Sequence, residues 1–199
     1  MNSENNRELE RKFRILKPSK EDVEKNIKKH LALADCVGLP DCQTLKTSQC
    51  RTLDHYFPMP GGNRTLRLRD SWGTNSLGYS EQLQEITLKI NDKATIEDRF
   101  ELNFTFNTKD LKDAHKLLTL LQGKPTLIID KTETIFFLKD KTVISLSHIA
   151  NDSALYLEIE SANLTDLQYY ENMILHSHGS PIVTKLESSS FFDTYNKLK

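Results

Sequence analysis

The feature that most constrains the fold is a repeated alternation of charged and bulky apolar residues in short segments. Residues 85–90 read Glu-Ile-Thr-Leu-Lys-Ile, and residues 99–106 read Arg-Phe-Glu-Leu-Asn-Phe-Thr-Phe. Because successive side chains of a β-strand point to opposite faces, each segment predicts a strand with one charged face and one apolar face. The same alternation occurs in residues 7–16, 64–70 and 155–160. The chain therefore predicts several strands whose charged residues share one side of a sheet.

The predicted strands do not alternate regularly with helices. About eight strands can be counted, whereas helical patterns occupy residues 20–34, 108–122, 165–178 and 189–198, and the Gly, Ser and Asn content of residues 71–80 predicts a flexible loop. This order favours an α+β fold with a mostly antiparallel sheet. Such a sheet is either open, with its charges in water, or closed into a barrel, with the charges inside and helices covering the apolar outside.

Composition limits the classes of protein to which this chain can belong. Its 199 residues suffice for one domain with a sizeable core, and 37% hydrophobic and 28% charged residues are typical of a globular protein. The formal net charge of −1 gives no global field for nucleic acid or an anionic membrane. No run of about 18 apolar residues could span a membrane, and residues 1–14 lack the apolar core of a signal peptide. We therefore expect a cytoplasmic protein without nucleic-acid or membrane partners.

The charged residues that share strand faces are of both signs. The cations are Lys12, Arg67, Arg69, Lys89, Arg99 and Lys131, and the carboxylates are Glu8, Glu10, Glu85, Glu101, Glu158 and Glu160. Arg and Lys side chains bind the oxygens of a phosphate chain, and Arg can do so in bidentate fashion. A carboxylate cluster would repel the same anion unless a hard divalent cation such as Mg²⁺ or Mn²⁺ lay between them. Inside a closed sheet, these residues would form a site for a polyphosphate and a divalent metal.

Several of these segments resemble the motifs of one protein family. Residues 8–12, Glu-Leu-Glu-Arg-Lys, resemble the ExExK signature of the CYTH domain, which belongs to the triphosphate tunnel metalloenzyme superfamily. The further matches are Asp54-His-Tyr-Phe-Pro58 to its YFDTP segment, Leu66-Arg-Leu-Arg69 to LRLR, Ile86-Thr-Leu-Lys89 to TLK, Arg99-Phe-Glu101 to RxE and Leu157-Glu-Ile-Glu160 to EIE. The matches follow the family's order over residues 8–160. One short motif would be weak, but the ordered set is fairly specific.

The resemblance implies a fold, a substrate and a set of site residues. It implies that residues 1–199 form one domain, a closed antiparallel tunnel of eight strands with helices packed outside, which binds a triphosphate with Mg²⁺ or Mn²⁺. The implied phosphate-binding residues are Lys12, Arg67, Arg69, Lys89, Arg99, Lys131 and Lys185. The implied metal ligands are Glu8, Glu10, Glu158 and Glu160, assisted by Glu101. The residues implied in catalysis are Glu8, Glu10, Lys12, Glu158 and Glu160.

Three positions depart from the family's pattern. Asn103 stands where the family has a second acid, Glu133 stands where it has an Arg, and Ser147 stands where it has an Asp. Glu133 removes one positive charge and adds a negative one. These changes affect the second metal site and part of the phosphate-binding set.

The resemblance leaves three functions open. The first is a metal-dependent phosphohydrolase in which water attacks the terminal phosphorus of tripolyphosphate, thiamine triphosphate or a nucleoside triphosphate. The second is an adenylate cyclase of the class-IV type, in which the ribose hydroxyl attacks the α-phosphate in the same tunnel. The third is a binding module that has lost turnover, as the changes at Asn103 and Ser147 suggest. We favour the hydrolase because the first metal-binding strand and the main Lys and Arg set are complete, and we leave open whether the chain forms a homodimer.

Overall fold

The computed structural model describes most of the chain as strands and helices. The described residues are 7–17, 19–36, 44–60, 64–91, 98–150, 152, 154–176 and 182–187, with the backbone alone described for residues 7, 8, 33–36, 44, 45, 91, 98, 99, 183 and 185–187. The strands are β1 (Arg7–Lys17), β2 (Thr44–Phe57), β3 (Arg64–Asn75), β4 (Ser80–Asn91), β5 (Asp98–Phe106), β6 (Leu127–Leu138), β7 (Val143–Ile149), β8 (Leu155–Ser161) and β9 (Val183–Glu187). The helices are α1 (Lys20–Cys36), the 3₁₀-helix η2 (Thr108–Asp110), α2 (Leu111–Gln122), α3 (Leu164–Glu171) and the π-helix η3 (Asn172–His176).

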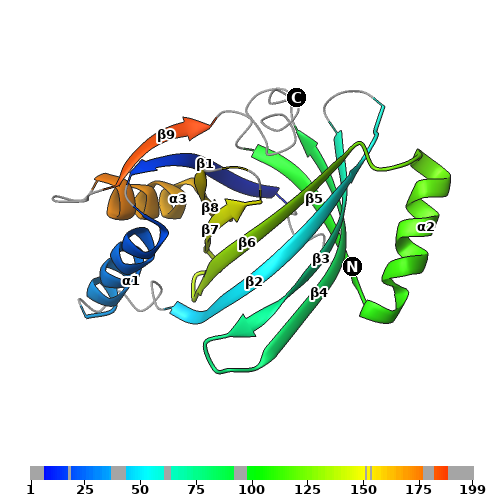
Figure 1. Cartoon of the computed structure of the whole chain (residues 1–199). Helices are drawn as coiled ribbons and strands as arrows, with labels where there is room; N and C mark the ends of the chain where they lie inside the picture. Colours follow the sequence, from blue (N-terminus) through cyan, green and yellow to red (C-terminus); the bar gives the residue numbers. More distant parts are fainter. Residues whose placement is uncertain are drawn as a thin grey trace.

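The strands form one antiparallel sheet in the order β5-β4-β3-β2-β6-β7-β8-β1-β9 (Figure 1). Most neighbours in this order are consecutive in the chain, as in a sheet built from hairpins. The predicted α+β class with an antiparallel sheet is therefore confirmed. The described part of the chain contains nine strands rather than the predicted eight, because β9 adds to the edge of β1.

Strand β1 also brings the two ends of the sheet together. One edge of β1 pairs with β8 over residues 9–15. The other edge pairs with β9 over residues 12–17 and with β5 over Arg7↔Phe100, Glu8↔Arg99 and Leu9↔Asp98. Among the described residues this contact comprises three pairs, so β5 and β1 are joined at one end only. The complete eight-stranded tunnel stays a prediction.

The apolar core lies on the outer face of the sheet, beneath the helices. The larger cluster, between α1, α3 and strands β1, β6, β7 and β8, includes Phe13, Val23, Ile27, Phe136, Leu146, Leu157, Leu167 and Tyr170. The smaller cluster, between α2 and strands β2 and β3, contains Phe57, Leu66, Leu68 and Leu118. Figure 1 shows α1 and α3 together at one side of the molecule and α2 at the other. The predicted packing of helices outside the sheet is confirmed.

Helix α1 shows how the sequence directs this packing. Ser19 Oγ accepts a hydrogen bond from the Asp22 amide at 3.3 Å and donates one to Asp22 Oδ2 at 2.8 Å, which stabilises the first turn. Val23, Ile27 and Leu31 follow at intervals of four residues and are all buried against the sheet. The opposite side of the helix carries exposed Lys residues, as expected for a helix with one apolar stripe.

A third apolar cluster lies on the inner face, the side of the sheet away from the helices. It contains Tyr56, Leu127, Ile129, Ile149, Ala154 and Tyr156. Strand alternation places Tyr56 on the same face as Asp54, and Ile129 on the same face as Lys131. The charged inner face is therefore bordered at one end by packed apolar side chains, which the sequence did not predict.

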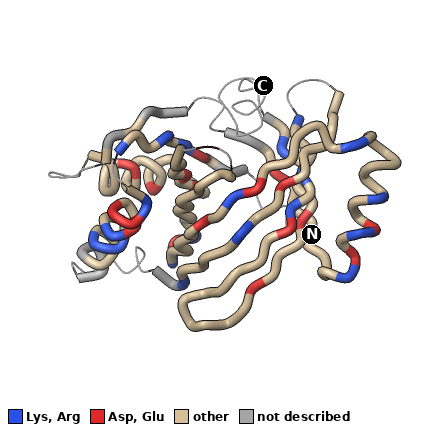
Figure 2. Tube along the Cα trace, viewed as in Figure 1, with Lys and Arg blue, Asp and Glu red and all other residues tan. Residues whose placement is uncertain are grey.

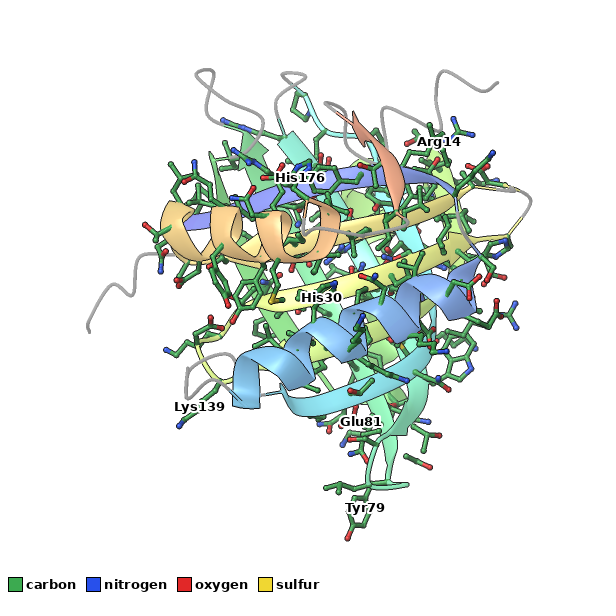
Figure 3. All side chains as sticks on the ribbon, turned by 90° about the vertical axis from the view of Figure 1, so that its left-hand side faces the viewer. Arg14, His30, Tyr79, Glu81, Lys139 and His176 are labelled. Atoms are coloured by element: carbon green, nitrogen blue, oxygen red, sulfur yellow. The ribbon has the colours of Figure 1, made fainter. Side chains whose placement is uncertain are left out.

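The prediction of a flexible loop at residues 71–80 is wrong. Strand β3 continues to Asn75 and β4 begins at Ser80, so that the two strands form a long hairpin. Gly73 permits this extension, because a Cβ atom there would lie 2.0 Å from the Gln49 carbonyl oxygen on β2. Figure 3 shows Tyr79 at the projecting tip of the hairpin.

Of the two helices predicted in the C-terminal part, one differs from prediction and the other is not tested. The helix expected at residues 165–178 is α3 followed by a π-helical turn, over residues 164–176. The helix predicted at residues 189–198 lies outside the described residues. None of the helices in the described part of the chain has the length and apolar character that crossing a membrane requires.

Replacing Ile27 by Ala should destabilise the fold strongly, since its side chain is fully buried between α1 and the sheet. We expect the free energy of unfolding to fall by about 2–5 kcal/mol, measured by urea denaturation. Lys25→Ala is the matched control on the exposed side of the helix and should change it by less than about 0.5 kcal/mol. A similar loss in both variants would contradict the packing of α1.

Candidate functional site

The inner face of the sheet gathers charged side chains from strands far apart in the sequence. Cross-strand pairing and alternation place the following residues on this face: Glu10, Lys12, Asp54, Arg67, Arg69, Glu85, Thr87, Lys89, Glu101, Lys131, Glu133, Ser147, Glu158 and Glu160. Figure 2 shows residues of both charges along the strands as well as on the helices. Many of these polar side chains are buried, which requires that each charge be compensated locally.

Asp54 on β2 compensates the arginines of β3. Arg69 Nε donates to Asp54 Oδ1 at 2.7 Å, and Arg69 Nη2 donates to Asp54 Oδ2 at 2.9 Å. The pairing follows from register, because Asp54 and Arg69 are cross-strand partners. Lys131 Nζ lies 3.8 Å from Asp54 Oδ2, and Arg67 Nε lies 3.9 Å from Asp54 Oδ1. One carboxylate thus lies among three of the predicted phosphate-binding cations.

The electrostatic balance at Asp54 favours its ionised form. Burial alone would raise the pKa of Asp54, but the charges of Arg69, Arg67 and Lys131 and the Arg69 hydrogen bonds hold it well below its usual range. The carboxylate therefore stays charged at any pH near neutrality and fixes the positions of the cations around it.

Glu133 and Ser147 form a second compensating group. Lys131 Nζ lies 2.7 Å from Glu133 Oε1, and Ser147 Oγ donates to the same oxygen at 2.9 Å. Burial raises the pKa of Glu133, but Lys131 and Arg69 outweigh this effect and lower it. The two departures from the family's pattern are therefore neighbours, and the acid at Glu133 has a cation and a hydroxyl donor beside it.

Arg67 is the described cation that is best placed to accept a ligand. Its Nη2 donates to Thr87 Oγ1 at 2.9 Å and to Glu85 Oε1 at 3.2 Å. Its Nε is buried and has no hydrogen-bond acceptor among the described residues. A buried donor without an acceptor is costly, and an anion at this position would satisfy it.

The carboxylates implied as metal ligands lie on β1, β5 and β8. Lys89 Nζ lies 2.6 Å from Glu101 Oε2 and 3.7 Å from Glu10 Oε2, while Glu10 and Glu160 are cross-strand partners. Burial, together with the charge of Glu10, raises the pKa of Glu158, and the same two causes raise the pKa of Glu160 to about 7. Like-charge repulsion of this kind would be relieved by a bound cation.

The donor chemistry of this group fits a hard divalent cation, since its ligands are carboxylate oxygens. Among the described residues, however, no three acidic, histidine or cysteine side chains are arranged as a complete metal-binding group. Lys89 lies between two of the carboxylates and acts as their counter-ion. Binding of a metal here would require Lys89 to move away from Glu10 and Glu101.

Three implied site residues have no described side chain. They are Glu8, Arg99 and Lys185. Their backbones show that Glu8 pairs with Arg99 across β1 and β5, and that Lys185 on β9 pairs with Arg14. Their roles stay predictions.

Sequence reasoning missed Asp54 and Thr87 as members of the site. Both contact the predicted arginines, and both lie on the charged face by alternation. The signal for Asp54 was its position two residues before Tyr56 in the segment that resembles YFDTP. Its pairing with Arg69 depends on the register between β2 and β3, which the sequence alone does not give.

Comparison with known proteins identifies the fold. No protein-family model matches the chain, and no curated protein matches its sequence. The PH1819 protein from Pyrococcus horikoshii OT3 is 15% identical with a TM-score of 0.71, over 96% of this chain and 99% of that one. A candidate adenylate cyclase from Vibrio parahaemolyticus is 15% identical with a TM-score of 0.61, over 97% and 99%. The candidate adenylyl cyclase HpAC1 from Hippeastrum, described as having a dominant triphosphatase activity, is 15% identical with a TM-score of 0.57, over 96% and 96%.

The chain has the fold of these structures. The comparison therefore shows a shared fold. The similarity extends over nearly the whole of each chain, so the strands that carry the motifs and the helices outside them belong to one shared architecture.

Removal of the Asp54 carboxylate should destabilise the protein much more than removal of a similar carboxylate at the surface. Asp54→Ala leaves buried cations uncompensated, so we expect the free energy of unfolding to fall by about 3–5 kcal/mol in urea denaturation. Asp130→Ala is the matched control. Asp130 accepts hydrogen bonds from Arg51 Nε at 2.9 Å and Nη2 at 2.5 Å, but Arg51 is exposed. We expect a loss below about 1 kcal/mol there, and equal losses would contradict the compensating role of Asp54.

The raised pKa of Glu160 predicts a specific dependence of stability on pH. The folded protein holds the Glu160 proton up to about pH 7, whereas the unfolded chain releases it near the ordinary pKa of about 4.3. Stability therefore falls as pH rises between these two values. Glu160→Gln stays neutral, so its melting temperature should gain on that of the wild type between about pH 5 and about pH 8.

The measurement is calorimetry in a buffer that contains EDTA, so that no divalent cation neutralises the carboxylates. Glu21→Gln, an exposed change on α1, controls for the loss of a carboxylate at the surface. A difference between Glu160→Gln and wild type that is constant with pH would show that Glu160 does not titrate in this range.

Proposed function

We propose that this protein is a divalent-metal-dependent phosphohydrolase that acts on a triphosphate bound at the inner face of its sheet, which closes around the substrate as a tunnel. The observation that carries the proposal is the buried Arg67 Nε, which lacks an acceptor among the described residues, beside Arg69 and Lys131. Such a donor within a buried cationic group fits a multiply charged anion with several oxygens. The triphosphatase activity described for the similarly folded HpAC1 supports this substrate class.

The arginines of β3 would bind the phosphate chain in different ways. Arg69 is held by two hydrogen bonds to Asp54, so its remaining N–H groups have a fixed direction. Arg67 would use its Nε, because its Nη2 is bonded to Thr87. Lys131 and Lys12 would add positive charge from the neighbouring strands. A preorganised set of this kind pays little ordering entropy when the anion binds.

The carboxylates Glu10, Glu158 and Glu160, together with Glu8 and Glu101, would hold Mg²⁺ or Mn²⁺. When bound, the metal would neutralise phosphate charge and lower the pKa of a coordinated water. Lys89 would release Glu10 and Glu101 and turn toward a phosphate oxygen, so that one side chain serves as counter-ion in the empty site and as ligand in the filled one.

Two alternatives use the same residues. A class-IV-type adenylate cyclase would place the α-phosphate, rather than the terminal one, at the metal, and the Vibrio parahaemolyticus structure favours keeping this possibility. A binding module without turnover is favoured by Glu133, which adds a buried negative charge beside Lys131. The products formed from ATP, tripolyphosphate and thiamine triphosphate together distinguish all three functions. The cytoplasmic location stays a prediction.

Glu10→Gln should abolish turnover while the protein stays folded. With Mg²⁺ or Mn²⁺ and tripolyphosphate, thiamine triphosphate or ATP, we expect the wild type to release phosphate and the variant to be slower by about 100-fold or more. EDTA should stop the wild-type reaction, and added metal should restore it. Glu21→Gln on the exposed side of α1 is the matched control and should keep full activity.

The identity of the product decides between the alternatives. Formation of cyclic AMP and pyrophosphate from ATP would contradict the hydrolase proposal and show that the protein is a cyclase. Tight binding of tripolyphosphate without any product from the three substrates would show that the protein is a binding module without turnover. Circular dichroism of Glu10→Gln separates loss of chemistry from loss of the fold.

A further inference from the structure

The second half of β5 is exposed on both of its faces. On the outer face, Leu102 and Phe104 have exposed fractions of 44% and 67%. On the inner face, Asn103 and Thr105 are also exposed, whereas Thr87, the cross-strand partner of Asn103 on β4, is fully buried. The helices and strands in the described part of the chain therefore leave this half-strand uncovered.

One edge of this half-strand has no paired neighbour among the described residues. β5 pairs with β4 over residues 99–106, but with β1 over residues 98–100 only. Residues 102–106, Leu-Asn-Phe-Thr-Phe, contain no charged residue and no proline, which are the features that usually keep an edge strand from pairing with another chain. We call residues 102–106 the edge segment. It is suited to pair with a further strand.

The edge segment is complementary to a second copy of itself. In an antiparallel pair with Phe104 on the two-fold axis, the two Phe104 rings face each other, and Leu102 of each copy faces Phe106 of the other. These apolar side chains share the outer face. On the inner face, Asn103 of each copy faces Thr105 of the other, so that an amide and a hydroxyl group can form a hydrogen bond. No charged side chain opposes another of the same sign.

The position of β1 selects this register. A two-fold axis at Asn103 would place Phe106 of one copy opposite Phe100 of the other, but that edge of Phe100 is already paired with Arg7 of β1. An axis at Phe104 confines the pairing to the edge segment and leaves the contact between β1 and β5 intact.

The apolar surface continues from β5 to α2. Phe104 is the cross-strand partner of Ile86, and Ile86 packs against the apolar cluster beneath α2. Ala114 packs against the same cluster. Leu117 and Leu121 follow on the same side of the helix and have exposed fractions of 54% and 67%. The edge segment alone would form a small interface, but this surface adds apolar area toward the roughly 800 Å² per partner that a stable dimer needs.

We propose that the protein forms a homodimer in which the edge segments of two copies pair antiparallel about Phe104 and join the two sheets. A second copy is favoured over an unrelated chain because the edge segment is uncharged and complementary to itself. Residues 2–6, Asn-Ser-Glu-Asn-Asn, are a poorer partner, since they contain no apolar side chain that could cover Phe104. The dimer stabilises β5 beside Glu101, whose Oε2 lies 2.6 Å from Lys89 Nζ. The proposal does not depend on the reaction that the protein catalyses.

Light scattering of the full-length protein over a range of concentrations tests the dimer. Phe104→Lys places two like charges opposite each other at the two-fold axis and should weaken dimerisation by about 100-fold or more. Leu77→Lys is the matched control, because Leu77 lies at the tip of the β3–β4 hairpin with an exposed fraction of 75%, and it should leave the dimer intact. A wild type that is monomeric at its highest soluble concentration, or a dimer that Phe104→Lys does not dissociate, would overturn the proposal.

Disulfide cross-linking tests the register and keeps the proposal falsifiable if Phe104→Lys fails to fold. With Phe104 on the axis, the two Cα atoms at this position are about 4.5–5.5 Å apart, which a disulfide can bridge. On oxidation, Phe104→Cys should therefore give a covalent dimer, whereas Leu77→Cys and the wild type should not. A dimer in solution that Phe104→Cys fails to cross-link would contradict this register. A monomeric wild type whose urea midpoint falls with Phe104→Lys would assign the surface to another segment of the same chain and likewise refute the proposal.

Discussion

The interaction on which the interior depends is the pairing of the Asp54 carboxylate with the cations around it. Arg69 is bound at two points, and Arg67 and Lys131 lie within 4 Å. Without Asp54, Arg69 would lose both hydrogen bonds of this pair, and the buried Arg67 and Lys131 would keep only Glu85 and Glu133 as nearby carboxylates. Because β2 lies between β3 and β6 in the sheet, a single residue on this strand compensates cations on both neighbours. The charged interior can exist because its central strand supplies this acid.

The same compensation explains why the fold and the site can vary separately. The main apolar clusters lie outside the sheet, beneath α1, α3 and α2, while the charges lie inside. A change of an inner residue therefore leaves most of the core packing intact, provided that charge stays balanced. Glu133 illustrates this rule, since its buried carboxylate has Lys131 and the Ser147 hydroxyl within hydrogen-bond distance. Structures only 15% identical to this chain can share its fold for the same reason.

The parts of this structure that sequence predicted are those that depend on local periodicity. Alternation identified which face of β4 and β8 carries charge, and the spacing of Val23, Ile27 and Leu31 identified the buried stripe of α1. The sequence did not predict the register between neighbouring strands or which distant strands pair. Alternation places Asp54 on the charged face, but its pairing with Arg69 depends on the register between β2 and β3. Strand β9 and the length of the β3–β4 hairpin likewise depend on neighbours distant in the sequence.

The balance of charge at the inner face also determines how a polyanion can enter. Each predicted phosphate-binding cation whose side-chain contacts are described already has a carboxylate nearby, and burial together with the charge of Glu10 raises the pKa of both Glu158 and Glu160. A triphosphate alone would meet these acids as well as the cations and would be repelled by them. A divalent cation that binds the acids removes that repulsion and frees Lys89 for the anion. Because linkage is reciprocal, the anion must then strengthen binding of the cation by the same factor. Under the proposed function, metal and triphosphate therefore bind cooperatively. Binding requires the internal ion pairs to be broken, and the binding free energy of one ligand alone does not offset that cost.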